Sequence, residues 1–126
     1  MNPKDDVVVV TGAGGFIGGH LVADLRRQGC RRIRAVDIKP LDRWYQRFGD
    51  VENLSIDLEI RENCLRAAKG ARVIYNLAAN MGGMGFIENH KALCMLSVLI
   101  NTHMLMAARD CGAERYFFSS SACVYN

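Results

Sequence analysis

Three glycines near the start of the chain have the spacing of a phosphate-binding turn. Gly12, Gly15 and Gly18 directly follow a run of four valines. Glycine permits a tight turn and lets backbone N–H groups approach a pyrophosphate without a Cβ in the way. If a helix begins here, its first N–H groups, those of Phe16 and Ile17, and its dipole attract the same anion. A glycine triplet alone also fits an ordinary strand-to-helix turn, so the flanking sequence has to decide.

An acidic residue follows at the distance that a dinucleotide site requires. Asp37 ends a second apolar segment, residues 33–36, and lies 19 residues beyond Gly18. An acid at this point can accept both ribose hydroxyls of an adenosine, and its charge would repel a 2′-phosphate. The spacing therefore predicts NAD as the cofactor. Lys39 and Arg43 lie close by in the sequence and keep NADP as the alternative.

Two later segments are predicted to reach the same cofactor. Asp57 and the N–H of Leu58 follow a third apolar segment, where they can read the edge of the adenine ring. A helix N-cap is the alternative role for Asp57. Leu77, Ala78 and Ala79 follow a fourth strand, and small residues there let a cofactor lie against the backbone.

The elements that must position these residues alternate between strand and helix. Strands are predicted over residues 7–10, 33–36, 52–56, 71–77 and 115–119, and helices from residue 16 to Gly29, over 59–69 and from 88 or 89 to 111. In the first helix we expect the apolar side chains to point inward: Phe16, Ile17, Leu21, Val22 and Leu25. This order predicts a three-layer α/β fold with a doubly wound parallel sheet, a Rossmann fold, in one domain spanning residues 1–126.

Three segments allow two interpretations each. Residues 40–49 contain Trp44, Tyr45 and Phe48, which we expect to pack on the sheet edge, with adenine stacking as the alternative. Residues 80–87 are glycine-rich and fit either a ligand-ordered loop or a plain linker. The third helix carries many apolar residues, which fit either the core or a homodimer seam: Met95, Leu96, Leu99, Met104, Leu105 and Met106.

Composition excludes several function classes. The chain has 126 residues, half of them apolar, and a net charge of +3 from scattered basic residues. The tightest basic cluster, residues 31–34, is predicted to cap the preceding helix and cover a sheet edge, so no nucleic-acid partner is expected. No signal peptide and no membrane span are expected either. Five cysteines without a Cys-x-x-Cys pair indicate reduced thiols in the cytoplasm, and His90 with Cys94 is too few ligands for a metal.

A combination of motifs resembles a known family. The motifs are residues 11–18 (Thr-Gly-Ala-Gly-Gly-Phe-Ile-Gly), Asp37, Asp57 with Leu58, residues 76–79 (Asn-Leu-Ala-Ala) and residues 119–125 (Ser-Ser-Ser-Ala-Cys-Val-Tyr). Together they resemble the extended short-chain dehydrogenase/reductase family, the NAD-dependent epimerases and dehydratases of nucleotide sugars. Within it, residues 80–87 (Asn-Met-Gly-Gly-Met-Gly-Phe-Ile) and 121–123 resemble the GDP-mannose 3,5-epimerases.

The resemblance implies an isomerase that works by transient oxidation. NAD⁺ would take a hydride from C4 of a GDP-mannose-like sugar, the ketone would acidify the C–H bonds at C3 and C5, and the hydride would then return. By the same resemblance, Ser121 would hydrogen-bond the C4 oxygen and Cys123 would act as an acid/base. Gly82, Ala122 and these two residues would contact the substrate. The alternative for Cys123 is a small buried residue at a strand end.

The sequence departs from the family in two places. The family's Tyr-x-x-x-Lys pair is absent, since no tyrosine in the chain is followed by a lysine four residues later. We expect that pair, a sixth strand and a substrate domain to lie beyond Tyr125, so that the 126 residues alone would be inactive. In the third helix Ser97 replaces the family asparagine, and Asn101, one turn on, is a candidate substitute. The alternative functions are a 4-epimerase or 4,6-dehydratase of another nucleotide sugar, and a non-catalytic NAD-binding fragment.

Overall fold

The fold alternates strands and helices as the sequence predicts. The computed structural model describes residues 6–78 and 90–118. The elements in chain order are β1 (Val7–Thr11), α1 (Phe16–Arg27), β2 (Arg32–Asp37), the short 3₁₀ helix η2 (Leu41–Arg43), β3 (Glu52–Ser55), α2 (Arg61–Ala68), β4 (Ala71–Asn76), α3 (His90–Asp110) and β5 (Arg115–Phe118).

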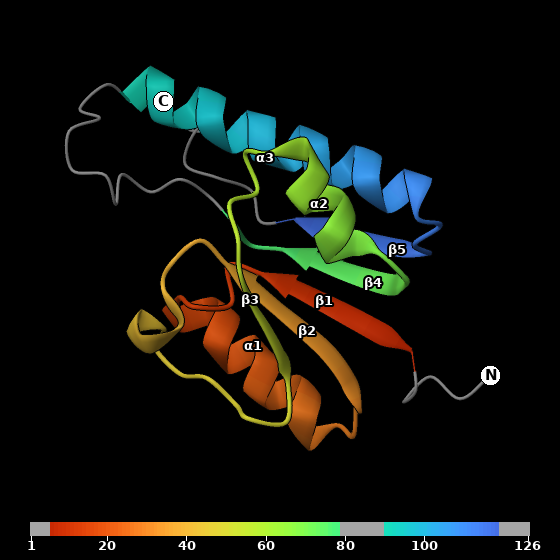
Figure 1. The fold of residues 1–126 in the computed structure, drawn as a ribbon. Helices are drawn as coiled ribbons and strands as arrows, with labels where there is room; N and C mark the ends of the chain where they lie inside the picture. The colour runs from red at the N-terminus through yellow and green to blue at the C-terminus, as the bar shows by residue number, and fades with distance from the viewer. Residues whose placement is uncertain (1–5, 79–89, 119–126) are drawn as a thin grey trace.

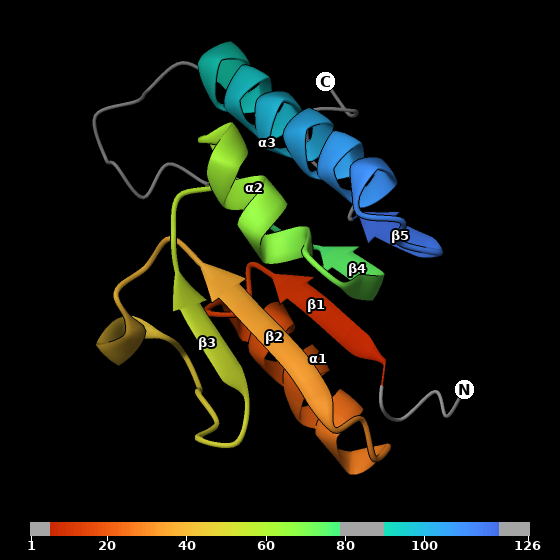
Figure 2. The ribbon, with the colours of Figure 1, turned by 45° about the vertical axis from the view of Figure 1, so that its right-hand side comes forward.

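A single parallel sheet of five strands, in the order β3-β2-β1-β4-β5, forms the middle layer (Figures 1 and 2). β1 lies at its centre, where Thr11 pairs with Val36 on one side and with Asn76 on the other. The sequence order reverses between β1 and β4, which is the switch point where α/β sheets bind ligands. Because all strands are parallel, their carboxyl ends lie along one edge of the sheet. Those residues predicted to bind the cofactor that the structure describes lie at this edge too. The predicted Rossmann-type fold is confirmed.

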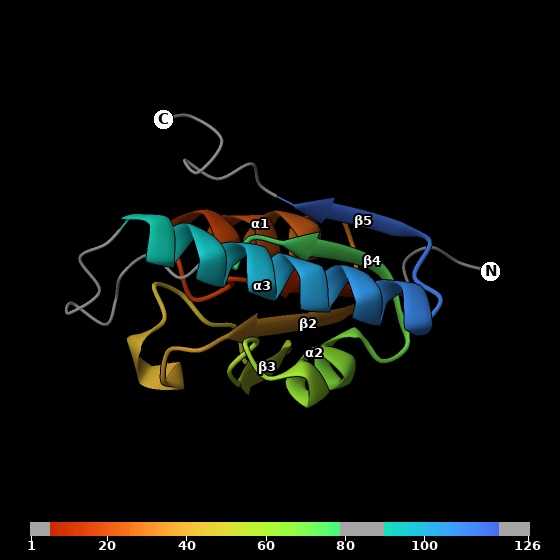
Figure 3. The same ribbon diagram turned by 90° about the horizontal axis from the view of Figure 1, so that it is seen from above.

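The valine run explains why both faces of the sheet are covered. Val7 and Val9 pack in the core under α2 and α3, whereas Val8 and Val10 pack in the core over α1. Figure 1 shows α1 on one side of the sheet with α2 and α3 on the other, and Figure 3 looks down onto α3 from above. Successive strand side chains point to opposite faces, so an uninterrupted apolar run needs a helix layer on each. Full burial of each valine contributes about 1.5 to 3 kcal/mol.

The first helix corrects one expectation about its apolar face. Val22 and Leu25 are buried as predicted, but Phe16 and Ile17 are 61% and 72% exposed. They occupy the first turn of α1, where the Phe16 ring packs edge-on against His20 and Tyr45 and not in the core. The helix ends at Arg27, and Gly29 takes φ +92°, the left-handed conformation expected of a helix-ending glycine.

The second helix begins two residues later than predicted. The Asp57 carboxylate accepts a hydrogen bond from the Glu59 N–H at 2.9 Å, and the Asp57 carbonyl accepts from Ile60 at 3.3 Å. This turn delays the helix, whose N-cap is Ile60 without any side-chain cap. The alternative N-cap role for Asp57 is therefore wrong. The strand β3 ends at Ser55, one residue earlier than predicted.

Arg34, one residue of the basic cluster at 31–34, contacts a different helix from the one that the cluster is predicted to cap. The Arg34 guanidinium donates to the carbonyls of Ala67 and Lys69, at 2.7 and 2.8 Å, and pairs with Glu52. Arg34 therefore satisfies carbonyls at the C-terminal end of α2, where a cation also complements the helix dipole.

The long helix α3 divides its apolar residues between core and surface. Met104 is fully buried with Ile100, Ala107 and Ala108 against the sheet. The outward face carries exposed apolar residues: Met95, Val98, Leu99, Leu105 and Met106. Among the described residues, no helix combines the length and apolar character needed to span a bilayer.

Candidate functional site

The glycine turn after β1 is packed too tightly for a side chain at Gly12 or Gly18. Gly12 has φ +71°, and a Cβ there would lie 2.8 Å from the backbone carbonyl of Leu77. A Cβ on Gly18 would collide with the carbonyl oxygen of Gly12 and lie 2.8 Å from the Cα of Ala13. The first glycine thus lets the turn touch the end of β4, and the third lets α1 start against the turn. The Gly15 N–H closes the turn on the Gly12 carbonyl at 3.1 Å.

The start of α1 leaves backbone donors for an anion. Its N-cap is Gly15, which makes no side-chain cap, and its first turn contains no acidic residue. The first N–H groups of a helix, here those of Phe16 and Ile17, have no partner within the helix. An uncapped N-terminus with a positive dipole end is suited to a pyrophosphate. This observation fits the predicted cofactor group.

Asp37 closes the other side of the turn. Its side chain is buried, and Oδ2 accepts the Gly14 N–H at 2.9 Å while Oδ1 accepts the Lys39 N–H at 3.0 Å. A carboxylate offers about four lone-pair positions, so two hydrogen bonds leave capacity for the hydroxyls of a ribose. The structure brings Asp37 to the glycine turn, as the spacing predicts.

Trp44 packs beside Asp37, and both residues lie against Gly14. Its indole is buried in the core over α1, and Nε1 donates to the Lys39 carbonyl at 2.9 Å. A Cβ on Gly14 would lie 2.9 Å from the Trp44 ring and 3.0 Å from the Asp37 carboxylate. The expected packing on the sheet is confirmed for Trp44. Tyr45 instead stays exposed and packs edge-on against Phe16, with ring centroids 5.0 Å apart.

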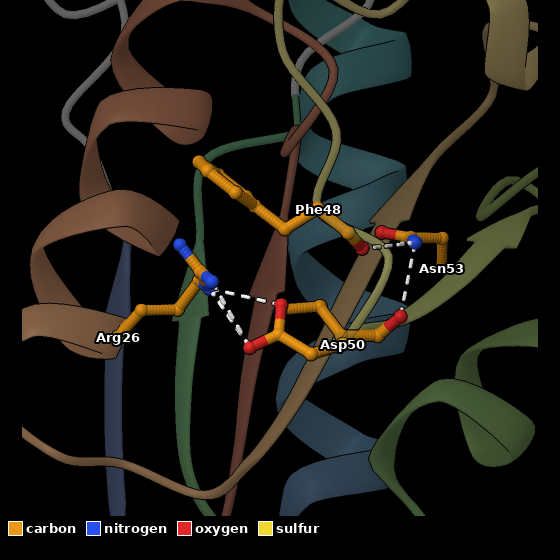
Figure 4. A network of polar contacts seen from close by, with 5 residues as sticks. Arg26, Phe48, Asp50 and Asn53 are labelled. Carbon is orange, nitrogen blue, oxygen red and sulfur yellow. Dashed lines mark hydrogen bonds and ion pairs between the residues drawn. The ribbon is translucent and has the colours of Figure 1, made fainter.

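The segment between β2 and β3 contacts α1 near its end, through Phe48 and Asp50 (Figure 4). The Arg26 guanidinium pairs with both carboxylate oxygens of Asp50, at 3.0 to 3.2 Å, and lies 4.3 Å above the Phe48 ring. Asn53 donates to the Phe48 carbonyl at 2.9 Å. The hydrogen bond from Arg26 lowers the pKa of the Asp50 carboxyl. The segment from Asp37 to β3 is thus held at both ends.

Asp57 and Leu58 lie at the carboxyl end of β3, in the same edge of the sheet. Leu58 is buried, and Asp57 is half-buried with one oxygen engaged by Glu59. Beneath them, the Cys64 thiol donates to the Leu58 carbonyl at 3.0 Å. Burial, with a smaller contribution from the Asp57 charge, raises the pKa of Cys64 to about 11. This thiol is therefore a packing group without reactive thiolate character.

A polar network behind this edge is absent from the sequence-based predictions. The Thr11 hydroxyl donates to Asn76 Oδ1 and accepts the Ala78 N–H at 3.1 Å. Asn76 Nδ2 donates to the Tyr116 hydroxyl at 2.8 Å and to Asn101 Oδ1 at 3.2 Å. The available signal was a polar residue, Thr11 or Asn76, at the end of an otherwise apolar strand. Asn101, the candidate substitute in the third helix, turns out to contact the end of β4.

Several predicted site residues lie outside the described residues: Ala79, Gly82, Ser121, Ala122 and Cys123. Their assignments stay predictions. Within residues 6–78 and 90–118 no cluster of three potential metal ligands occurs.

Comparisons with known proteins agree with this geometry. The sequence model of the NAD dependent epimerase/dehydratase family matches residues 8–126. The chain is 41% identical over 119 residues to GDP-mannose 3,5-epimerase 1 of Oryza sativa subsp. japonica, covering 94% of this chain and 31% of that protein. It is 40% identical to the Arabidopsis thaliana GDP-mannose 3,5-epimerase, covering 98% and 33%. The chain thus spans about a third of the length of these relatives.

A solved structure of similar fold carries a cofactor. It is a short-chain dehydrogenase/reductase superfamily protein from Agrobacterium tumefaciens with bound NAD, 28% identical to this chain. The two superpose with a TM-score of 0.70 over 94% of this chain and 34% of the other.

Proposed function

The chain belongs to the NAD dependent epimerase/dehydratase family, and from that membership we propose that its glycine turn binds NAD for the epimerisation of a GDP-hexose. The observation that carries the proposal is the packing of Gly12, Gly14 and Gly18 around an uncapped helix start, with the Asp37 carboxylate 2.9 Å from the Gly14 N–H. Identity of about 40% to GDP-mannose 3,5-epimerases supports the choice of substrate.

Each group of described residues is assigned to a different part of the cofactor. The first-turn N–H groups of α1 would bind the pyrophosphate, and Asp37 would accept the hydroxyls of the adenosine ribose. Asp57 and the Leu58 N–H are assigned to the adenine, and the backbone of Leu77 and Ala78 to the nicotinamide half. The negative charge of Asp37, which lies beside the buried Trp44 ring, would repel the 2′-phosphate of NADP. The site therefore favours NAD over NADP.

The proposed reaction needs a hydride acceptor and groups that move protons. The chemistry that NAD supplies when bound is reversible acceptance of a hydride from C4 of the sugar. The ketone left at C4 makes the C3 and C5 protons acidic, because the resulting enolate places its charge on oxygen. We assign Ser121 to the hydrogen bond at the C4 oxygen and Cys123 to proton transfer at the inverted carbons, with Gly82 and Ala122 against the sugar. The family's base for the C4 hydroxyl, a Tyr-x-x-x-Lys pair, does not occur among these 126 residues. Because the chain spans about a third of the length of the GDP-mannose 3,5-epimerases, we assign these 126 residues to the dinucleotide-binding domain of a larger enzyme.

Deuterium exchange tests the function and separates the rivals. The full-length gene product is incubated with GDP-mannose and NAD⁺ in deuterated water, and the sugar is followed by NMR. Deuterium at C3 and C5 with epimer formation is the expected result. A C4 epimer without deuterium would identify a 4-epimerase, and a 4-keto-6-deoxy sugar a 4,6-dehydratase. NAD binding without any product would identify a binding fragment.

We propose a homodimer in the cytoplasm as the working form. The outward face of α3 leaves Met95, Val98 and Leu105 exposed at spacings of three and seven residues, which places them on one side of the helix. A second copy that covered this face would bury it. Cys30, Cys64 and Cys111 are free thiols in the structure, as a reducing compartment requires.

A further inference from the structure

We propose that Tyr116 and Asn101 are positioning residues for the cofactor edge, because through Asn76 they hold the exit of β4 against the glycine turn. This inference rests on the proposed NAD site and assigns to it two residues that lie behind it. Neither residue belongs to the predicted binding set, and they come from β5 and α3.

The three side chains form a closed cluster of hydrogen bonds. The Tyr116 hydroxyl donates to Asn101 Oδ1 at 2.6 Å and accepts from Asn76 Nδ2 at 2.8 Å. Asn76 Nδ2 also donates to Asn101 Oδ1 at 3.2 Å. The two acceptors lie on the same side of Nδ2, 2.6 Å from each other, so these contacts fix the rotation of the Asn76 side chain and direct Oδ1 toward β1.

The cluster continues directly to the walls of the site. Asn76 Oδ1 accepts the Thr11 hydroxyl, which in turn accepts the Ala78 N–H at 3.1 Å. Thr11 precedes Gly12, and Gly12 touches the backbone of Leu77. A change in the orientation of Asn76 would therefore move the glycine turn and the Leu77–Ala78 backbone relative to each other.

Burial makes the cluster costly to leave incomplete. Thr11 and Asn76 are buried, so a donor of Asn76 that loses its acceptor finds no water in its place. Burial raises the pKa of Tyr116 to about 12, although the Asn76 hydrogen bond opposes the shift. The hydroxyl therefore stays protonated and remains a donor throughout the physiological range.

Tyr116→Phe tests the role, and Tyr75→Phe is its matched control. Tyr75 lies on the neighbouring strand, its ring stacks on Phe117 at 5.2 Å, and its hydroxyl has no hydrogen bond within the described part of the chain. Two quantities are measured: NAD affinity by calorimetry, and hydrogen exchange of the Ala78 amide without NAD. We expect Tyr116→Phe to weaken NAD binding roughly 3- to 10-fold and to accelerate Ala78 exchange. Tyr75→Phe is expected to change both by less than about twofold.

Ile100→Val separates positioning from general loss of stability. Ile100 is a core residue of α3 next to Asn101, and shortening it lowers the melting temperature without removing any hydrogen-bonding group of the cluster. It should leave NAD affinity and Ala78 exchange at the parental values. Parental values for Tyr116→Phe despite a lower melting temperature would overturn the proposal. A parent protein that fails to bind NAD would overturn the proposed function instead, while Ala78 exchange would still test the cluster.

Discussion

Asp37 is the residue on which the proposed choice of NAD over NADP rests. It accepts the Gly14 and Lys39 N–H groups and retains lone pairs for a ribose. Replacement by alanine removes charge-assisted hydrogen bonds, so we expect Asp37→Ala to weaken NAD binding by about 1 to 3 kcal/mol. Isothermal titration calorimetry measures the loss.

Asp42 provides the control for this substitution. It is an exposed acid in η2, five residues further along, and makes no described hydrogen bond with the turn. Asp42→Ala should bind NAD as the parent does. Equal affinity for the parent, Asp37→Ala and Asp42→Ala would contradict the assignment of Asp37.

Cys64 should make the protein sensitive to alkali. Its thiol has a pKa of about 11 in the fold against 9.0 in an exposed thiol. Between these values the unfolded chain loses the proton while the folded chain keeps it, so stability falls as the pH rises from about 9 to about 11. Two pKa units correspond to about 2 to 3 kcal/mol. Denaturant titrations of the parent and Cys64→Ala across this range measure the effect, and parallel pH curves for the two would contradict it.

At the scale of elements, the turn and α1 act as one unit. A Cβ on Gly18 would collide with the Gly12 carbonyl oxygen, and backbone cannot yield as a flexible side chain does. We expect Gly18→Ala to push α1 off the turn, lowering the free energy of unfolding by about 1 to 3 kcal/mol and abolishing measurable NAD binding.

Gly49 is the matched glycine. A Cβ there would meet nothing within 4 Å, so Gly49→Ala should leave unfolding and NAD binding unchanged or slightly stabilise the chain. Thermal melts and calorimetry on the two variants compare the sites. If Gly18→Ala behaved like Gly49→Ala, the close packing of the turn would be unnecessary for binding.

The sequence predicts the elements well because their signals are local. Valine runs, helix-ending glycines and the Gly18-to-Asp37 spacing all act over short distances along the chain. The inward orientation expected for Phe16 and Ile17 was wrong, because helical periodicity does not show which turns of a helix the core covers. Arg34 reaching α2 and Tyr116 meeting Asn101 depend on contacts between distant segments, so no local pattern could show them. The assignments of Ser121 and Cys123 come from resemblance and stay predictions.

At the scale of the whole molecule, the outward face of α3 makes self-association testable. Val98 and Leu105 are seven residues apart and both exposed on this face. Two glutamates in place of these side chains would lose their hydration in a dimer interface and would repel each other there. The double variant Val98→Glu with Leu105→Glu should therefore shift the protein toward monomer. Sedimentation velocity over a concentration series measures the shift.

Ile60→Glu is the control for that surface. Ile60 is a similarly exposed apolar residue at the start of α2, away from the outward face of α3. It should leave the sedimentation profile unchanged. A monomeric parent, or a double variant that associates as the parent does, would contradict the dimer proposal.

The central place of β1 sets an order for folding. β1 can pair with β2 after a short crossover through α1, but its other neighbour, β4, comes much later in the chain, and the Thr11–Asn76 contact spans 65 residues. Closing so long a loop costs entropy before any contact repays it, which slows folding. The first half of the sheet can therefore form while the cofactor edge is still open. The edge that would hold the dinucleotide is completed only when β4 docks, so we expect NAD to be recognised only after that late step.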